Sequence, residues 1–365
     1  MPGEFTFDSG RRSTRVVVAP GSRLEVPISK DRRVLVVVDQ SVANTFGKDV
    51  AEHLQARGAA VATFIIEASE SAKSLETVGH IIDAALAHRV DRGGVFVSVG
   101  GGITGDLVGC AAALHLRGVE VMHVPTTLLA MVDAALGGKT GANRQLPDGS
   151  LGKNLLGAFW PPSCVLVDVE TLESLPDRER RCGLAEALKH GLLRDPDLLK
   201  FIRDHRDALL SAEVDACDSL ALRAGQIKAL VVAEDAEEHG VRAILNLGHT
   251  FAHAIEGEPG LSYQHGEAVG LGLVAAARLA VVLGEASESF LDEVRCDVGA
   301  VGLPVTMPEA PDGAALLERM GFDKKTTVSG LRFVVPTPPC GAVVRSDVPE
   351  DAVVAAWTEV GVVFS

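Results

Sequence analysis

The segment Gly94-Val-Phe-Val-Ser-Val-Gly-Gly-Gly-Ile-Thr-Gly-Asp106 reads as a strand that runs directly into glycines and then into an apolar helix. The strand part is apolar at almost every position, without the alternation of a half-exposed strand. Continuous apolar strands of this kind are typical of parallel sheets that helices cover on both faces. The segment therefore predicts an α/β domain with a parallel, Rossmann-like sheet.

Further strands of the same kind are expected on both sides of this segment, over 33–39, 62–67, 119–124 and 165–169. Between two of them, residues 75–88 carry apolar side chains at helical spacing. Strands that alternate with helices indicate βαβ units. We therefore expect residues 1–175 to form the α/β domain.

From Pro176 onward the pattern becomes helical. Apolar residues recur at a helical period over 182–193, 217–233, 248–256, 265–283, 287–301 and 350–359. A short β pair at 331–336 and 341–344 interrupts the series. We expect residues 176–365 to form a mainly α-helical C-terminal domain, with a site in the cleft between the two domains.

The composition excludes several classes of protein. Lys and Arg number 34 against 49 Asp and Glu, a net charge of −15 that disfavours nucleic-acid binding. Residues 1–15 lack the apolar run of a signal peptide, and the longest apolar stretch, 271–283, contains Arg278 and is too short to span a bilayer. The six cysteines have no metal-clamp spacing, so we expect reduced thiols in a cytoplasmic protein that binds neither nucleic acid nor membrane.

The glycines at 100, 102 and 105 match the pattern G-x-G-x-x-G. Glycines let a backbone approach a pyrophosphate, and the N-terminus of the following helix offers N–H donors. The pattern does not lie in the first βα unit, so a plain strand-to-helix turn is the alternative. Asp106 is expected to cap the helix or to accept a hydrogen bond from a hydroxyl.

Two segments rich in lysine and asparagine, 133–143 and 152–154, are expected to be loops. Lysines beside glycines suit the capture of a phosphate or carboxylate. The first segment is no Walker motif, because the motif's first glycine is missing before Lys139. Solvated surface lysines are the alternative.

A carboxylate and three histidines are the strongest candidates for chemistry. Glu186 and Lys189 share one face of a predicted helix, His249 and His253 are one turn apart, and His265 begins the next helix. One carboxylate with two imidazoles makes a catalytic zinc site that leaves positions for substrate oxygens. Spacing alone does not say which histidines bind, and hydrogen-bonded helix residues are the alternative.

Together these segments resemble the 3-dehydroquinate synthase family of sugar-phosphate cyclases. The matching segments run from about Val34 to Val335, namely 70–76, 100–106, 116–118, 124–133, 137–141, 152–158, 183–189, 245–250, 265–267 and 323–325. No single segment is specific, but the set is.

The resemblance implies a role for each matched residue. Glu186, His249 and His265 would hold Zn²⁺ or Co²⁺. NAD would be held by Asp39, Glu70, Lys73, Gly100, Gly101, Gly102, Gly105, Asp106, Thr126 and Thr127. The substrate would be lined by Asp133, Lys139, Lys153, Asn154, Lys189, Lys228, Arg242, Asn246, His253 and Lys324 (or Lys325). Arg117 would reach the substrate phosphate across a homodimer interface. Residues 1–175 would then bind NAD, and 176–365 the metal and substrate.

The implied reaction converts 3-deoxy-D-arabino-heptulosonate 7-phosphate to 3-dehydroquinate, as in the shikimate pathway of aromatic amino acid biosynthesis. NAD would oxidise an alcohol held on zinc, phosphate would leave by β-elimination, NADH would return the hydride, and an aldol step would close the ring. Lys228, Asn246 and Lys324 favour a substrate with a carboxylate.

Other members of the superfamily remain alternatives: an aminodehydroquinate synthase or a sedoheptulose 7-phosphate cyclase of secondary metabolism. A glycerol dehydrogenase-like enzyme and an inactive relative with a binding role are more distant ones. Two departures from the family pattern stand out. The segment 144–151 is longer than usual, and its Pro-Asp-Gly turn is expected to point outward, while 234–238 lacks an arginine that the family often carries.

Overall fold

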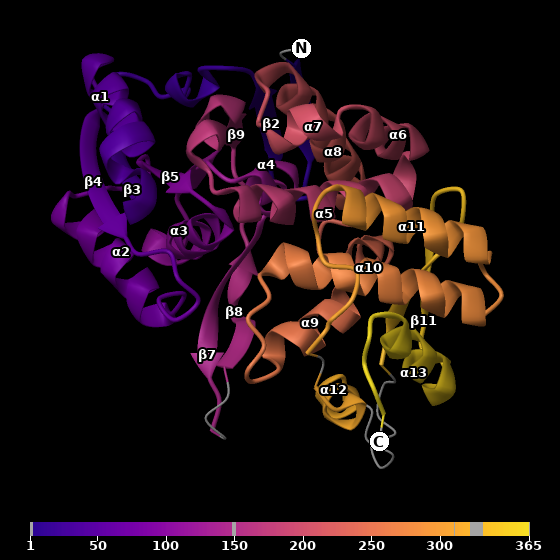
Figure 1. Cartoon of the computed structure of the whole chain (residues 1–365). Coiled ribbons are helices and arrows are strands. Elements are labelled where there is room, and N and C mark those ends of the chain that lie inside the picture. The colour runs from indigo at the N-terminus through magenta and orange to yellow at the C-terminus, as the bar shows by residue number, and fades with distance from the viewer. Residues whose placement is uncertain (1–2, 148–150, 310, 322–330, 365) are drawn as a thin grey trace. The chain divides into compact units, whose positions relative to one another are not determined.

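A computed structural model describes the chain except for residues 1–2, 148–150, 310, 322–330 and 365 (Figure 1). Residue contacts divide it into two compact units. The first comprises Met1–Leu175 and Ala212–Glu237, and the second comprises Pro176–Ser211 and Glu238–Ser365.

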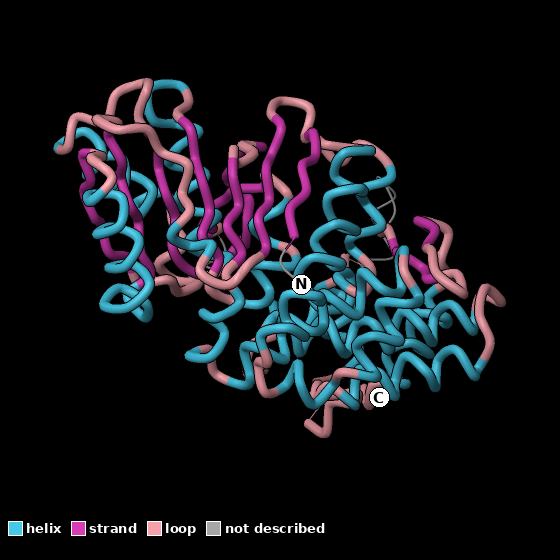
Figure 2. The backbone as a smooth tube through the Cα atoms, turned by 90° about the horizontal axis from the view of Figure 1, so that it is seen from above, coloured by secondary structure: helices cyan, strands magenta, loops and turns pink. Residues whose placement is uncertain are grey.

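The first unit is built on a sheet of order β1-β2-β9-β6-β5-β3-β4. These strands are β1 (Gly3–Asp8), β2 (Ser13–Val18), β3 (Arg33–Asp39), β4 (Ala60–Ile66), β5 (Val95–Gly100), β6 (Glu120–Pro125) and β9 (Cys164–Val167). β1 pairs with β2 antiparallel, and all the other pairs are parallel. Figure 2 shows the strands side by side. The predicted parallel sheet is confirmed, and the first strand pair extends it.

Two apolar clusters cover the faces of this sheet. Leu35 and Phe96 belong to the cluster that includes residues of α2 (Leu75–Ala87) and α3 (Gly102–Leu114). Their neighbours along the strands belong to a second cluster with α1 (Lys48–Ala56). Because successive side chains of a strand point to opposite faces, both faces are buried and the strands need no polar alternation.

Part of the first lysine- and asparagine-rich segment, 139–143, and all of the second, 152–154, lie in strands rather than in the expected loops. β7 (Lys139–Gln145) and β8 (Leu151–Phe159) form an antiparallel pair. Their residues have low strand propensity, but packing outweighs propensity here. A side chain at Gly109 of α3 would meet Thr140 of β7 at 2.4 Å, so helix and hairpin lie in close contact. The expected turn at 147–149 falls largely outside the described residues.

The helix α8 (Val214–Glu234) belongs to the first unit, although the sequence placed it with the second half. The reason is local packing. A Cβ at Gly225 would lie 3.2 Å from Leu136 and 3.3 Å from Phe5, so the missing side chain lets α8 approach β1. The assignment of separate functions to 1–175 and 176–365 stays a prediction.

The second unit is mainly helical, as predicted. Its helices are α5 (Asp177–Arg194), α6 (Pro196–Asp204), α7 (Arg206–Leu210), α9 (His249–Gly257), α10 (His265–Val282), α11 (Glu288–Ala300), α12 (Gly313–Arg319) and α13 (Glu350–Glu359), with the strand pair β10 (Phe333–Pro336) and β11 (Ala342–Arg345). α10 packs against α5, α9, α11 and α13. Side chains at Gly266 or Gly272 of α10 would strike backbone atoms of Cys182 or Gly248 within 2.2 Å. These glycines bring α5, α9 and α10 together.

By length and composition alone α10 could cross a membrane, and it is the one helix of that kind in the described part of the chain. However, 72% of it is buried inside the protein, as for the central helix of a helical domain. The six cysteines are all free thiols, four of them buried.

Candidate active site

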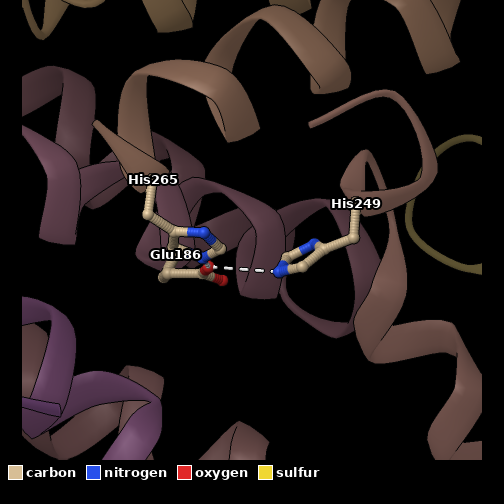
Figure 3. Close-up of side chains that lie close together, drawn as sticks. All are labelled: Glu186, His249 and His265. Atoms are coloured by element: carbon tan, nitrogen blue, oxygen red, sulfur yellow. Dashed lines mark hydrogen bonds and ion pairs between the residues drawn. The ribbon is translucent and has the colours of Figure 1, made fainter. Parts of the chain in front are cut away.

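Three side chains of the second unit converge from three different helices (Figure 3). Glu186 comes from α5, His249 begins α9 and His265 begins α10. The Nε2 atom of His265 lies 3.2 Å from Glu186 Oε1, and the Nε2 atom of His249 lies 3.5 Å from the same oxygen. Glu186 is almost fully buried, so an ionised carboxylate there needs a cation or a proton close by.

Local sequence fixes the backbone at both histidines. His249 follows Gly248, which has a left-handed φ of 77° and would strike the backbone of α10 if it carried a side chain. His265 follows Gln264, which forms a capping box with Glu267. Both imidazoles therefore start from rigid helix ends.

The separations within this cluster fit a metal ion. Zinc lies about 2.1 Å from its nitrogen and oxygen ligands, and a tetrahedral arrangement then separates the ligands by about 3.4 Å. The two distances from Glu186 Oε1 match that value. Glu186, His249 and His265 can thus hold a metal as three ligands with an open fourth position. His253 is not part of this group of three, although its exposed ring lies beside that of His249, 5.6 Å away between centroids.

Charged neighbours surround the three residues. Lys189 Nζ lies 2.5 Å from the other oxygen of Glu186, and both side chains are 1% exposed. Burial opposes a charge on His265, but hydrogen bonds to Glu186 and Glu256 raise its pKa to about 10. Glu256 was not among the residues expected from the sequence. Its spacing was a usable signal, because residues 249, 253 and 256 share one face of a helix.

Two other expected residues of the second unit, Arg242 and Asn246, lie in the short 3-10 helix Val241–Asn246. Arg242 is fully buried, and the Asn246 side-chain amide donates to Glu238 Oε1 at 3.1 Å. Lys324 and Lys325 lie outside the described residues.

In the first unit, the glycine turn between β5 and α3 lines a pocket. Its lining includes Gly100, Gly101, Gly102 and Gly105, and the other lining residues are Ser98, His123, Pro125, Ala130, Ala134 and Ala135. A Cβ at Gly105 would come no nearer than 4.0 Å to the His123 ring, so this glycine leaves open space. The N-terminus of α3 adds N–H donors and a partial positive charge, which suits an anion such as a pyrophosphate.

Expected cofactor residues adjoin this turn. A Cβ on Gly100 would lie 3.0 Å from Asp39 Cβ, and a Cβ on Gly101 would lie 3.1 Å from Thr127 Cγ2. The backbone N–H of Thr126 donates to Gly100 at 2.9 Å. Because β3, β5 and β6 are parallel neighbours, their carboxyl ends gather these residues.

His123 was not predicted from the sequence. It pairs in register with Ser98 on the adjacent strand, and the Ser98 hydroxyl lies 2.6 Å from His123 Nδ1. Burial lowers the pKa of His123 to about 4, so a neutral imidazole lines the pocket at pH 7. A single histidine inside a strand forms no motif, and only the strand register reveals the pair.

A second group of expected residues forms a polar network. Lys73 Nζ lies 2.5 Å from both Asp106 Oδ2 and Asn154 Oδ1. Burial raises the pKa of Asp106, and Lys73 opposes that rise. Asn143, which was not predicted, donates to Glu70 Oε2 at 2.7 Å. Hydrogen bonds therefore connect Asn154, which is expected to line the substrate, with residues that are expected to hold the cofactor.

Asp133 and Lys228, both expected to line the substrate, form an ion pair. Lys228 Nζ lies 2.8 Å from Asp133 Oδ1. Lys139 is exposed at the start of β7, and Lys153 Nζ lies 4.0 Å from Glu70 Oε1. Arg117 is exposed, with a left-handed φ of 69°.

Comparison with family models gives two adjacent matches. Residues 63–182 match the 3-dehydroquinate synthase N-terminal model, and residues 183–326 match the 3-dehydroquinate synthase C-terminal model. The 3-dehydroquinate synthase of Desulforamulus reducens is 40% identical over 342 residues, covering 92% of this chain and 93% of that protein. That of Saccharophagus degradans is 38% identical over 97% of this chain and 98% of its own length.

Two solved structures are also similar to this chain over most of its length. ValA, a 2-epi-5-epi-valiolone synthase from Streptomyces hygroscopicus subsp. jinggangensis 5008 with NAD⁺ and Zn²⁺ bound, is 30% identical, with a TM-score of 0.84 over 98% of this chain and 97% of that one. Glycerol dehydrogenase from Schizosaccharomyces pombe is 17% identical, with a TM-score of 0.63 over 90% of this chain and 84% of that one. The second similarity concerns the fold alone.

Proposed function

The chain belongs to the 3-dehydroquinate synthase family, and on that premise we propose that it converts 3-deoxy-D-arabino-heptulosonate 7-phosphate to 3-dehydroquinate and inorganic phosphate. Such an enzyme is a carbon–oxygen lyase acting on a phosphate. The observation that carries the proposal is the convergence of two imidazole Nε2 atoms on one oxygen of Glu186, at separations that suit zinc.

The residues present fit both cofactors of the proposed reaction. Glu186, His249 and His265 would hold zinc or cobalt, and the pocket at the glycine turn would take NAD. When bound, these groups would supply Lewis acidity and a hydride acceptor that regenerates in each cycle. NAD⁺ and Zn²⁺ are bound in the related valiolone synthase.

The side chains of this protein have three tasks. Glu186 and the two imidazoles would fix the position of the reacting alcohol. Lys189, buried beside Glu186, would place its ammonium group next to the place where oxygen becomes more negative during the reaction. Asp39, Glu70, Lys73, Asp106, Thr126 and Thr127 would orient the cofactor around the glycine turn.

The substrate would be held by the remaining residues inferred from the sequence. A charged set suits a carboxylate and a phosphate, and its members are Asp133, Lys139, Lys153, Asn154, Lys189, Lys228, Arg242, Asn246, His253, Lys324 and Arg117. The Asp133–Lys228 pair, 2.8 Å apart, would hold the ammonium group of Lys228 in place until substrate binds. We further propose a cytoplasmic homodimer in which Arg117 reaches the partner's substrate.

A substrate panel tests the proposed reaction. The protein is incubated with NAD, zinc and one sugar phosphate at a time, including sedoheptulose 7-phosphate, and phosphate release and product mass are measured. We expect turnover with the heptulosonate, and no NADH accumulation at 340 nm, because a cyclase returns the hydride. NADH that grows in proportion to substrate consumed would instead indicate a dehydrogenase.

The metal site has its own test. His265→Ala should lose tightly bound zinc and nearly all turnover while its unfolding stays cooperative, because a three-ligand site cannot lose one imidazole and keep its geometry. Metal analysis after dialysis gives the stoichiometry. Full zinc content in the variant would mean that His265 is not a ligand.

A further inference from the structure

In both imidazoles of the metal site, the Nδ1 atom, which points away from Glu186, lies near an oxygen atom of the protein. His249 Nδ1 lies 3.1 Å from the backbone oxygen of Leu247, and His265 Nδ1 lies 3.4 Å from Glu256 Oε2. Each ring thus turns Nδ1 toward an oxygen of the protein and Nε2 toward Glu186.

Once a metal ion is bound and both rings are neutral, this arrangement dictates where the remaining proton of each ring lies. A neutral imidazole carries one N–H, and a nitrogen that binds a metal must offer its lone pair. A backbone carbonyl and an ionised carboxylate can only accept a hydrogen bond. Leu247 and Glu256 therefore both favour the Nδ1–H form, which leaves Nε2 free to bind a metal.

Glu256 is well placed for this task. It lies on α9, seven residues after His249, and its side chain is 9% exposed. The backbone of His265 is already fixed by the capping box at the start of α10. The side-chain torsions of His265 can still turn its ring, and the contact with Glu256 restricts that rotation.

We propose that Glu256 is a positioning residue of the metal site, which orients His265 and holds the proton on its Nδ1 atom. A carboxylate behind a metal-bound imidazole also makes that ligand more basic, and loss of such partners typically weakens metal binding about 10- to 100-fold. The inference rests on the metal site of the proposed function.

The test compares two neighbouring substitutions of equal charge in the full chain. Glu256→Gln removes the carboxylate behind His265. Glu258→Gln is the matched control, because Glu258 pairs with Arg319 at 2.6 Å instead of facing a histidine. The zinc dissociation constant is measured by competition with a chromophoric chelator, and the visible spectrum is recorded with cobalt bound.

We expect Glu256→Gln to raise the zinc dissociation constant about 10- to 100-fold and to shift the cobalt absorption bands, because the imidazole becomes a weaker donor. Glu258→Gln should match the wild type in both. The melting temperature of the metal-free proteins checks folding. Equal zinc affinity in all three proteins would overturn the role of Glu256 alone, whereas a wild type that binds no zinc would overturn the metal site and this inference with it.

A second measurement needs no variant. In the cobalt-loaded wild type, proton NMR should show two strongly shifted signals that vanish in D₂O, one from each Nδ1–H. Strongly shifted Cβ protons of either histidine, which only a ring bound through Nδ1 brings close to the cobalt ion, would contradict the proposal.

Discussion

The side-chain oxygen of Asn143 accepts a hydrogen bond from the backbone N–H of Asn154 at 2.9 Å, where Asn154 has a left-handed φ of 55°. The same side chain donates to Glu70, and the Asn143 backbone N–H donates to the Lys73 carbonyl at 2.7 Å. One buried amide thus connects the hairpin of β7 and β8 with the segment before α2. It also holds Asn154 in a conformation that is unfavourable for most side chains.

Replacing this amide by a carboxylate should destabilise the protein in a pH-dependent manner. Asn143→Asp puts a carboxylate oxygen where the Nδ2 donor now faces Glu70, 2.7 Å away. We expect the free energy of unfolding to fall by about 2 kcal/mol at pH 7, from like-charge repulsion and a lost buried donor. Urea unfolding at pH 7 and pH 4 measures it. The deficit should shrink at pH 4, where one carboxylate takes up a proton, whereas Asn143→Ala should show no such recovery.

A methyl group in the glycine pocket should block the nucleotide without harming the fold. Gly105 lies in α3, and a Cβ there meets nothing nearer than 4.0 Å. Alanine is also favoured over glycine in a helix by roughly 0.5–1 kcal/mol. We therefore expect Gly105→Ala to keep or raise the melting temperature and to weaken NAD binding by about tenfold or more, equivalent to about 1.4 kcal/mol. Calorimetric titration of NAD is the measurement.

Gly299→Ala is the control for that experiment, since Gly299 lies in α11 and a Cβ there would only touch Val305 at 3.6 Å. It should leave NAD affinity unchanged. Unaltered NAD affinity in folded Gly105→Ala would place the nucleotide elsewhere.

Asp218 should make the protein less stable as the pH rises. Burial raises the pKa of Asp218 to about 6, with Asp168 and Asp215 adding to the rise. In the unfolded chain the pKa is about 3.9, so the folded state binds more protons between pH 4 and pH 6, and its stability falls across that range. Asp218→Asn removes this loss, and the free energy of unfolding at pH 7 should rise by about 2 kcal/mol.

Urea unfolding at pH 4.5 and pH 7 tests the Asp218 prediction. The gain should be much smaller at the lower pH, where the wild-type carboxyl is already largely protonated. An equal gain at both values would attribute the effect to packing instead of charge.

A substitution at Lys139 tests whether this residue binds the substrate anion or is an ordinary surface lysine. It is exposed at the start of β7, so Lys139→Ala should leave the melting temperature within about 2 °C, as for most surface substitutions. If the ammonium group binds the substrate, kcat/KM should fall by on the order of 10²-fold or more. Phosphate release gives the rates, and the exposed Lys48→Ala, which changes a surface pair with Glu52, is the control. Wild-type kinetics in both variants would make Lys139 a solvated lysine.

The sequence was sufficient to locate those strands and helices whose pattern of apolar residues fits one type of secondary structure only. The strands β3 and β5 and the helices α9, α10 and α13 lie within a few residues of their predicted positions. Burial on both faces gives a strand a continuous apolar run, and burial along one stripe gives a helix a clear period. The β7–β8 hairpin was missed because its lysines, asparagines and glycines do not resemble a strand. Its contact with α3, which is remote in sequence, stabilises it.

The site shows the same division. Glu186 and the histidines stood out by residue type, and the family resemblance selected His249 and His265 over His253. In the structure three helices bring these two imidazoles to Glu186. Glu256, His123 and Asn143 escaped notice because each acts through a partner from another element. Single residues of these types are common. The helical spacing of Glu256 from His249 was a usable signal, whereas only their contacts distinguish His123 and Asn143.

The discontinuity of the first unit has a consequence for the newly made chain on the ribosome. Synthesis proceeds through all the strands of the first unit and then through Pro176–Ser211 before it reaches α8, which packs on β1. Until then Phe5 and Leu136 lack the helix against which they pack. The first unit therefore cannot complete its core during translation until roughly two thirds of the protein has been made, and a gene fragment cut at the boundary of the two family models, after residue 182, encodes an incomplete unit.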